Sequence, residues 1–357
     1  MNFAARSMIS ADKLLGWDKL VFVLLAFVCA AAVALATTPL AKRLAVKLGI
    51  IDVPKDARRM HKDSVPMLGG LAIYLGTVVA ALIFLNFDTT LVAGFAGATI
   101  IFVLGVFDDR FDIPAWIKLV VQLVAASIPV IFGLRIEFVA LADSKIYLEW
   151  LAVPITVLWI VGITNAVNFI DGLDGLACGV SLISAASLCF LAVFLGRDDS
   201  AVITAAVAGA CLGFLPYNRH PAKIFMGDCG ATFLGYLMAF VSVYGLFKTS
   251  AFISLAGPVI IMALPIFDAL WAIVRRVAKG QSPMTADRGH LHHRLIDSGV
   301  SHKVAVRIVH IICIMFSLLA IVFAFFGVLY TLILAAALAA VSVIAVKLHK
   351  KEKNEKQ

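Results

Sequence analysis

Eleven apolar stretches, each of about 20 residues, constrain the fold of this chain more than any other feature of the sequence. A helix that spans a bilayer needs about 20 mostly apolar residues. The stretches cover residues 20–41, 68–86, 90–107, 114–132, 150–168, 177–196, 200–217, 229–247, 251–274, 304–325 and 327–346. Their alternation with short polar segments predicts an all-α polytopic membrane protein with about eleven transmembrane helices.

The composition agrees with a membrane-embedded chain. Of the 357 residues, 62% are hydrophobic and 15% are charged, and the mean hydropathy is +1.02. Soluble domains carry about 25% charged residues, so a soluble globular fold is excluded. We expect residues 1–346 to form a single integral membrane domain, followed by a basic cytosolic tail at 347–357. The six cysteines include no CxxC pair, which argues against a disulfide framework or a thiolate metal site.

Lysine and arginine are distributed unequally between the two sets of connecting segments. With eleven spans, the two termini face opposite sides of the membrane. The connections on one side carry 22 Lys and Arg residues, and those on the other side carry seven. Cytoplasmic loops are enriched in these residues, so we predict an external N-terminus and a cytosolic C-terminus. This orientation requires an odd number of spans.

Two further segments bear on the predicted topology. Residues 34–36, Ala-Leu-Ala, resemble a signal-peptidase site that follows an apolar stretch. Cleavage there would carry the basic segment that follows across the membrane, against the charge distribution, so we favour an uncleaved helix. Residues 133–149 alternate in part between polar and apolar side chains, which predicts a small external β-hairpin.

The unusual acidic residues lie in short polar segments that all fall on the predicted cytosolic side. Carboxylates near hydrocarbon are costly, so their repeated occurrence at helix ends predicts a polar site facing one side of the membrane. If the helix that contains Asp108 continued, Asp108 and Asp112 would share one of its faces. The acids concerned are Asp108, Asp109, Asp112, Asp171, Asp174 and Asp228.

This acidic pattern indicates a divalent cation. Close carboxylates repel one another unless a cation or a shared proton relieves them. Mg²⁺ prefers oxygen ligands and commonly binds one or two carboxylates together with substrate phosphates. Glycines stand beside Asp171, Asp174 and Asp228, which allows tight turns and close approach of the backbone to a ligand. For Asp108 and its neighbours, a hydrated helix end with Arg110 as counter-ion is the alternative.

Cationic and aromatic residues accompany the acids. Three histidines at 290, 292 and 293 could bind zinc, but no cysteine or further acid stands nearby at ligand spacing. Histidines flanked by arginines fit the recognition of phosphate or sugar hydroxyls better. Phe225 could stack on a nucleobase or could simply pack within the protein. Asp268 lies inside an apolar stretch, where an ionisable residue indicates a function.

These motifs closely resemble those of the polyprenyl-phosphate N-acetylhexosamine-1-phosphate transferase family. The matching segments occur in family order, and five ordered motifs are far more specific than one. The sequence His-Leu-His-His-Arg at 290–294, with Asp112, resembles the branch that uses UDP-GlcNAc and undecaprenyl phosphate more than the phospho-MurNAc-pentapeptide translocases. Cys229 departs from the commoner small residues at its position. The matching segments are 66–70, 108–112, 165–176, 225–230 and 290–294.

The resemblance implies an enzyme that transfers GlcNAc-1-phosphate from UDP-GlcNAc to undecaprenyl phosphate and releases UMP. It implies dependence on Mg²⁺, for which Mn²⁺ can substitute. The reaction would be the first membrane step of a cell-surface polysaccharide, such as O-antigen, common antigen or a teichoic acid linkage unit. The expected location is the bacterial inner membrane, with the active site facing the cytosol. The expected partners are a UDP-N-acetylhexosamine, a polyprenyl phosphate and the bilayer, without nucleic acid; a homo-oligomer is left open.

The resemblance also implies residue roles. Asp228 would be a direct metal ligand, with Asp171 as a second candidate ligand, and Asp108 and Asp109 would lie at the lipid phosphate. The histidine segment would hold the pyrophosphate and sugar, whereas a uridine pocket would be lined by Asp171, Asp174, Asn218 and Phe225. The candidate catalytic residues are Asp108, Asp109, Asp112, Asp171 and Asp174. The candidate substrate-binding residues are Lys62, Asn168, Asn218, Phe225, His290, His292, His293 and Arg294.

Two other classes of protein are consistent with part of the pattern. A transporter of nucleotide sugars or phosphorylated metabolites would use the same charges for binding only. The chain shows no internal repeat, and its polar segments lie on one side, which argues against a transporter. A CDP-alcohol phosphotransferase would need a contiguous signature of the Asp-Gly-Ala-Arg type, which the sequence lacks.

Overall fold

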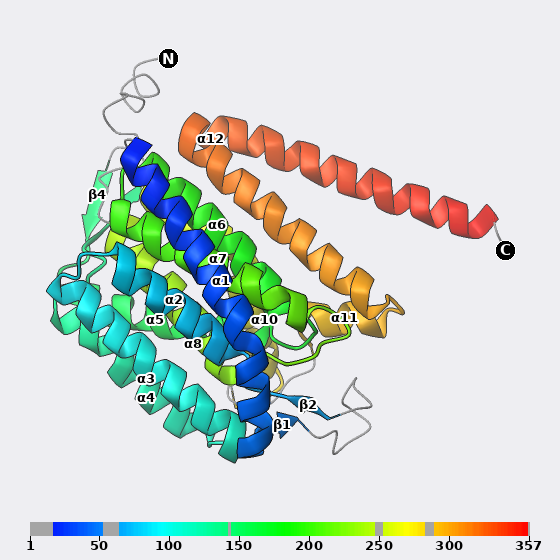
Figure 1. The fold of residues 1–357 in the computed structure, drawn as a ribbon. Helices are drawn as coiled ribbons and strands as arrows, with labels where there is room; N and C mark the ends of the chain where they lie inside the picture. Colours follow the sequence, from blue (N-terminus) through cyan, green and yellow to red (C-terminus); the bar gives the residue numbers. More distant parts are fainter. Residues whose placement is uncertain (1–16, 53–63, 142–143, 247–252, 283–288, 356–357) are drawn as a thin grey trace.

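The computed structural model describes residues 17–52, 64–141, 144–246, 253–282 and 289–355. The predicted substrate-binding residue Lys62, with its neighbours Arg58 and Arg59, lies outside these ranges. Within them the chain is mostly α-helical, and its strands form two short antiparallel pairs (Figure 1).

Each predicted apolar stretch is largely helical over the part that the structure describes. The helices of the first two thirds of the chain are α1 (Trp17–Leu48), α2 (Gly70–Phe84), α3 (Thr89–Phe111), α4 (Ala115–Ile131), α5 (Ala152–Phe169), α6 (Leu176–Phe194), α7 (Asp198–Asn218) and α8 (Gly227–Val241). A 3₁₀ turn at Glu149–Leu151 precedes α5, and a π-helical turn at Ser242–Leu246 follows α8.

The last third of the chain differs in detail from the prediction. The expected single span at 251–274 is divided into α9 (Ile253–Ile261) and α10 (Ala263–Ala278). A short helix that was not predicted, α11 (Leu291–Asp297), carries most of the histidine motif. The final helix, α12 (His302–Glu355), covers both remaining stretches and is interrupted at Gly327, whose φ of 78° is not helical.

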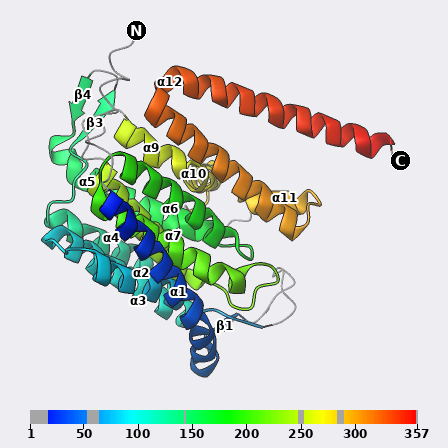
Figure 2. The ribbon, with the colours of Figure 1, turned by 45° about the horizontal axis from the view of Figure 1, so that its top comes forward.

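The arrangement is that of an all-α membrane protein. Six of the described helices are long and apolar enough to cross a membrane. In Figure 1, α8 lies among α2, α3 and α5, against which it packs, and every residue of α8 except Asp228 is buried. Figure 2 shows the first half of α12 beside α6 and α9, whereas the part after Gly327 stands apart from the other helices.

Small residues let the inner helices approach one another closely. A Cβ atom added at Gly209 or Gly213 of α7 would collide with backbone carbonyl groups of α1. A Cβ atom at Gly105 of α3 would likewise collide with the backbone at Cys229, near the start of α8. Because lipid supplies little hydrophobic drive between helices, such close contacts carry much of the packing energy in a membrane protein.

Both strand pairs lie at ends of the bundle. Strands β3 (Phe138–Leu141) and β4 (Ser144–Tyr147) form an antiparallel pair, so the hairpin predicted at 133–149 is confirmed. Strands β1 (Ile51–Asp52) and β2 (Val65–Pro66) pair near the opposite end (Figure 1).

Main-chain hydrogen bonds join the segment before α8 to the start of α2. Phe225 donates its N–H to the carbonyl oxygen of Pro66 at 2.8 Å and accepts the N–H of Gly69 at 2.9 Å. Gly70 donates its N–H to the carbonyl oxygen of Met226 at 2.8 Å. These bonds fix the first turn of α8, and with it Asp228, relative to α2.

Candidate active site

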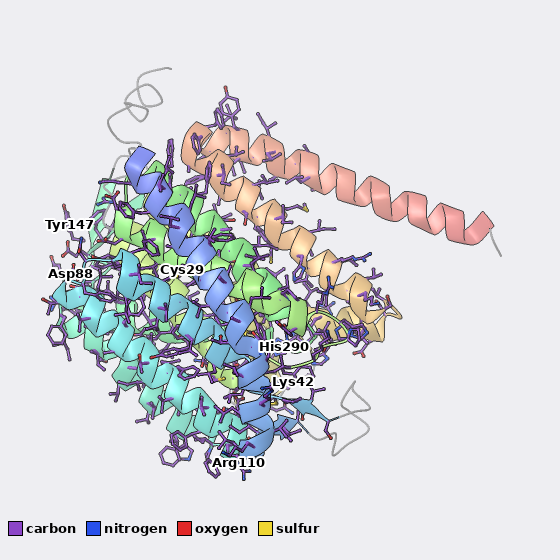
Figure 3. The ribbon with its side chains drawn as sticks, viewed as in Figure 1. Cys29, Lys42, Asp88, Arg110, Tyr147 and His290 are labelled. Atoms are coloured by element: carbon purple, nitrogen blue, oxygen red, sulfur yellow. The ribbon has the colours of Figure 1, made fainter. Side chains whose placement is uncertain are left out.

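The polar segments gather at one end of the helix bundle. In Figure 3, Arg110, Lys42 and His290 lie toward one end, whereas Asp88 and Tyr147 lie toward the other. The C-terminus of α3, the loop between α5 and α6, the start of α8 and the short helix α11 share the end that carries Arg110 and His290. The predicted convergence of the acidic and histidine motifs is therefore present in the fold.

Lys118 of α4 connects two of the acids. Its ammonium group lies 2.6 Å from the carboxylate of Asp108 and 3.6 Å from that of Asp228. Asp108 is buried, and its second oxygen accepts the backbone N–H of Ile113 at 2.8 Å. A buried charge requires a partner, and Lys118 supplies it to Asp108. The sequence analysis did not select Lys118, because a contact between the end of α3 and the start of α4 has no local sequence pattern.

Asp109 faces a different group from its neighbour in the motif. One of its carboxylate oxygens accepts the backbone N–H of Asp228 at 2.8 Å, and the other accepts that of Cys229 at 3.2 Å. These N–H groups belong to the first turn of α8, which has no partner for them within its own helix. Asp109 therefore caps α8 from another helix.

Asn168 and Asp171 complete the acidic site from the end of α5. The side-chain amide of Asn168 donates to Asp228 at 3.5 Å, while its oxygen is buried without a hydrogen-bond partner among the described residues. Burial, with repulsion from Asp228 and Asp174, raises the pKa of Asp171 to about 7. Carboxylate oxygens and an unsatisfied amide oxygen form the hard donor set that Mg²⁺ prefers, so these residues fit that cation.

Asp112 is not part of this buried group. Helix α3 ends at Phe111, and Asp112 follows in the left-handed conformation with a φ of 53°. The helix does not continue, so Asp108 and Asp112 do not share a helical face. Asp112 is exposed, whereas Asp108 is buried.

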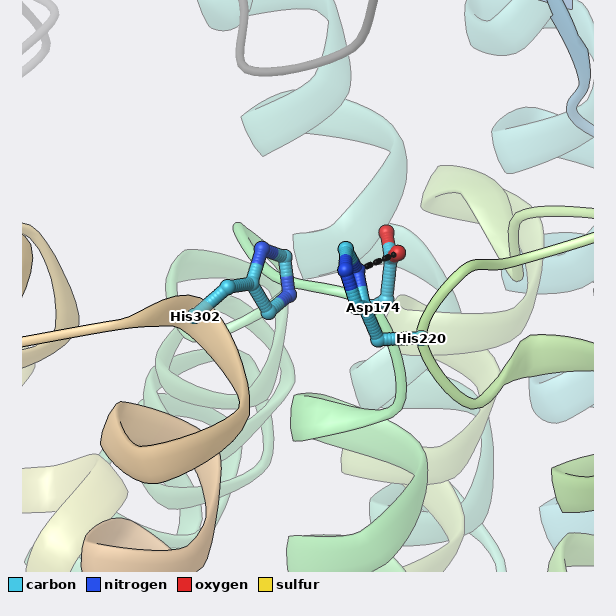
Figure 4. Close-up of side chains that lie close together, drawn as sticks. All are labelled: Asp174, His220 and His302. Carbon is cyan, nitrogen blue, oxygen red and sulfur yellow. Dashed lines mark hydrogen bonds and ion pairs between the residues drawn. The ribbon is translucent and has the colours of Figure 1, made fainter.

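Asp174 joins two loops by pairing with a histidine that the sequence analysis did not select. One of its oxygens lies 2.7 Å from Nδ1 of His220 and accepts the N–H of Ala222 at 3.1 Å. The ring of His220 stacks on that of His302, with centroids 4.3 Å apart and an angle of 28° (Figure 4). Donor atoms of the three residues lie within 4.8 Å of one another. In stacked rings, however, the in-plane nitrogen lone pairs point in similar directions and do not converge on one ion. The arrangement therefore favours a hydrogen-bonded pair with a stacked ring over a shared metal ion.

Asn218 and Phe225 help to build the same loops. The side chain of Asn218 accepts the N–H of Gly175 at 3.1 Å and donates to the carbonyl oxygen of Ile224 at 3.1 Å. Asn218 is buried, and its amide thus ties the glycine-rich loop to the segment before α8. Phe225 is half-buried in that segment.

The histidine motif is held by α11. His290 lies 2.9 Å from Asp268 of α10, and His292 is buried against the glycine-rich loop, because a Cβ atom at Gly172 would collide with its Nε2. Burial, with the charges of His293 and His290, lowers the pKa of His292 to about 3. The ring of His293 lies 4.3 Å from that of His292, and Arg294 is exposed. Nε2 of His292 has no hydrogen-bond partner among the described residues.

The sequence is similar to known proteins over most of its length. The family model described as "Glycosyl transferase family 4" matches residues 91–246, which contain Asp108, Lys118 and Asp228. A Bacillus subtilis protein named "Probable undecaprenyl-phosphate N-acetylglucosaminyl 1-phosphate transferase" is 41% identical over 308 residues, covering 85% of this chain and 86% of the relative. The chain belongs to glycosyl transferase family 4.

The chain is also similar to two further relatives. A Mycolicibacterium smegmatis protein named "Decaprenyl-phosphate N-acetylglucosaminephosphotransferase" is 36% identical over 301 residues, covering 75% of this chain and 74% of the relative. The Escherichia coli K12 "Undecaprenyl-phosphate alpha-N-acetylglucosaminyl 1-phosphate transferase" is 28% identical over 275 residues, covering 74% of each chain. The family resemblance identified from the motifs is therefore confirmed.

Proposed function

We propose that this chain transfers GlcNAc-1-phosphate from UDP-GlcNAc to undecaprenyl phosphate and releases UMP. The bridge that Lys118 forms between Asp108 and Asp228 carries the proposal, because it sets a cation between two acids at one end of a membrane bundle. The names of the relatives from Bacillus subtilis and Escherichia coli, which act on undecaprenyl phosphate by name, support the same reaction.

The acceptor in this reaction needs little activation. A polyprenyl phosphate is already anionic near neutral pH, so one of its oxygens can attack the phosphorus that carries the sugar. A phosphorus–oxygen bond forms there, and the bond from that phosphorus to the bridging oxygen breaks. UMP leaves with the electron pair of the broken bond. The principal barrier is the approach of two anions, which positive groups relieve.

Lys118 is the residue best placed to assist that approach. Its ammonium group is held by Asp108 and lies close to Asp228, so its position is set before substrate arrives. A preorganised cation stabilises negative charge at a transferring phosphoryl group without reorganisation during the reaction. Asp108, in turn, orients Lys118.

Mg²⁺ completes the proposed site. Asp228 and Asp171 would hold the ion, with the buried oxygen of Asn168 as a third donor. Bound there, Mg²⁺ supplies positive charge to the phosphates of both substrates and acts as a Lewis acid. Mn²⁺ prefers similar oxygen ligands and is expected to substitute.

The histidine motif is proposed to receive the donor. His292 is neutral near pH 7 because its pKa lies at about 3, so it can accept or donate a single hydrogen bond. Arg294 is exposed on the same short helix and offers a fork of donors for a phosphate. His290 and His293 flank them. A uridine pocket around Asp174, Asn218 and Phe225 stays a prediction, and the loops that these residues join would form its wall.

The proposed location is the bacterial inner membrane, with this end of the bundle facing the cytosol. The excess of Lys and Arg in the connections at this end supports the orientation. Eleven spans, an external N-terminus and an external β3–β4 hairpin belong to the same proposal. The product would enter the synthesis of a cell-surface polysaccharide.

One experiment tests the proposed function directly. Purified protein is incubated with radiolabelled UDP-GlcNAc, undecaprenyl phosphate and Mg²⁺, and both UMP and the labelled lipid are measured. We expect the two products in equal amounts, and neither with the Asp228→Asn variant. A transporter would instead move the donor into proteoliposomes without forming UMP, and that result would refute the proposal.

A further inference from the structure

We infer that Asp268 is a positioning residue for the sugar-nucleotide donor, acting through His290 and the first turn of α11. The inference rests on the proposed function, because it assigns the donor to the histidine motif. It adds a residue from α10, outside the motif, to the binding of that substrate.

The two oxygens of the Asp268 carboxylate hold two different groups of the motif. One oxygen lies 2.9 Å from Nδ1 of His290, and the other accepts the backbone N–H of Leu291 at 2.9 Å. The side chains of Asp268 and His290 are only 8% and 7% exposed. The contact is thus buried and uses both carboxylate oxygens, so water screens it less than it would screen an exposed ion pair.

The contact with Asp268 decides which ring nitrogen of His290 carries a hydrogen. A carboxylate accepts a hydrogen bond, so Nδ1 of His290 must be the donor, and Nε2 is then the atom left for a ligand or for a second proton. Neighbouring rings fix the orientation further. The centroid of the Phe169 ring lies 5.6 Å from that of the His290 ring. The His292 ring stacks on the His290 ring, with centroids 5.9 Å apart and an angle of 5° between the planes.

Asp268 also controls how α11 meets the acidic site. His292 follows His290 by two residues and lies against Gly172, immediately after Asp171. A path of direct contacts therefore runs from Asp268 through His290 and His292 to the glycine-rich loop. If Asp268 released the first turn of α11, His292 would lose its place beside Asp171.

Asp268 itself does not face the substrate. Both of its oxygens are engaged, and its neighbours Phe267 and Trp271 are exposed on the apolar outer face of α10. The effect of Asp268 on the donor passes through His290, and this distinguishes positioning from chemistry.

A double-mutant cycle in the full-length protein tests the inference. The variants are Asp268→Ala, His290→Ala and the double variant, with Asp297→Asn as the matched control because Asp297 is an exposed acid on α11. We expect Asp268→Ala to raise the donor KM about tenfold to a hundredfold, the loss typical of a charged hydrogen bond. The acceptor KM should change less than about twofold. In the His290→Ala background, Asp268→Ala should have little further effect on the donor KM, because the two residues act as one unit.

Two further measurements separate the role of Asp268 from a general loss of folding, and the second does not depend on the reaction. Asp268→Asn keeps an acceptor oxygen for the N–H of Leu291, but its amide nitrogen cannot accept a hydrogen bond from Nδ1 of His290, so its donor KM should lie between those of the wild type and Asp268→Ala. Trypsin cleavage after Arg294, which is exposed on α11, should be faster in Asp268→Ala than in Asp297→Asn without any substrate.

The outcomes separate this inference from the proposed function. Additive effects in the cycle, equal rises in donor and acceptor KM, or unchanged cleavage after Arg294 would overturn the role of Asp268. A wild-type protein that forms no UMP would instead overturn the proposed function, and the cleavage rates would still report whether Asp268 holds α11.

Discussion

The carboxylate of Asp109 accepts a hydrogen bond from the backbone N–H of Asp228, a residue 119 positions later in the chain. Its second oxygen accepts the N–H of Cys229. Met226, which precedes α8, has no side-chain oxygen that could cap the helix. The carboxylate therefore satisfies donors that α8 leaves open and lies at the positive end of the helix dipole. Within one motif, Asp108 contacts Lys118, whereas Asp109 shapes the turn that carries Asp228.

Loss of this interhelical cap should lower stability as well as turnover. Removal of a cap typically costs about 0.5–2 kcal/mol, so Asp109→Ala should reduce the melting temperature in detergent by several degrees, roughly as expected for that energy. Asp112→Asn, in the same motif but exposed, is the control and should melt like the wild type. An unchanged melting temperature with complete loss of activity would assign Asp109 to the chemistry at the lipid phosphate instead.

Activity should depend absolutely on a divalent cation. Excess chelator should abolish formation of UMP, and Mg²⁺ or Mn²⁺, but not zinc, should restore it. Asp228→Asn should abolish turnover in a protein that elutes as a folded species from a sizing column. Asp112→Asn should be milder, because Asp112 is exposed and lies outside the buried group. Persistent activity in chelator would contradict the metal site.

Lys118 should be important for turnover, although it lies outside the sequence motifs. Lys118→Ala would leave the buried carboxylate of Asp108 without its cation, and it would remove positive charge from the transferring phosphate. We expect kcat to fall about a hundredfold to a thousandfold. Lys303→Ala, a change at an exposed lysine, should leave kcat within about twofold of the wild type. A similar small effect in both variants would show that Lys118 only balances charge.

The histidine motif should determine which sugar-nucleotide donor the protein uses. We expect turnover of UDP-GlcNAc and none of UDP-MurNAc-pentapeptide, measured by release of UMP from each. Arg294→Ala should raise the donor KM and lower kcat, because charge-assisted contacts to the pyrophosphate strengthen as charge moves to UMP. A basic segment that merely anchored a helix end would leave both constants unchanged.

The buried His292 should make the protein sensitive to acid. Its pKa is about 3 in the folded protein, below the ordinary value of 6.5, so the unfolded chain binds a proton first as the pH falls. The stability from this group is therefore complete above pH 6.5 and is lost between pH 6.5 and about 3, at about 1.4 kcal/mol per pH unit. His292→Gln should show a smaller fall in melting temperature between pH 7.5 and 5 than the wild type. Equal falls would show that the ring is protonated in the folded state.

The helices and the acidic end of the bundle could be predicted because both depend on local sequence. The length of an apolar stretch predicts helices such as α3 and α7, and a carboxylate at the end of such a stretch can be recognised from the sequence alone. The break between α9 and α10 could not be predicted, because residues on both sides of Met262 are equally apolar. The hairpin at 133–149 was predicted from its alternation.

The partners of the acids were beyond the sequence for a different reason. The pairing of Asp174 with His220 joins residues 46 positions apart, and it depends on how two loops meet. The same holds for Asp268, which lies in α10, and His290, which immediately precedes α11. The residue types indicated a charged site. The different hydrogen-bond partners of Asp108 and Asp109, however, depend on the three-dimensional fold and cannot be inferred from the residue types.

The separation of 119 residues between Asp109 and Asp228 has a consequence for biosynthesis. A ribosome that has completed α3 and α4 has made Asp108 and its lysine partner, but the amide groups that Asp109 binds have yet to be translated. Until α8 is made, the carboxylate of Asp109 lacks its native partners, the backbone N–H groups of Asp228 and Cys229. The histidines arrive later still. The order of translation thus delays the completed centre until nearly all of the helical core is in place, and a chain released before α8 carries only part of the acidic site.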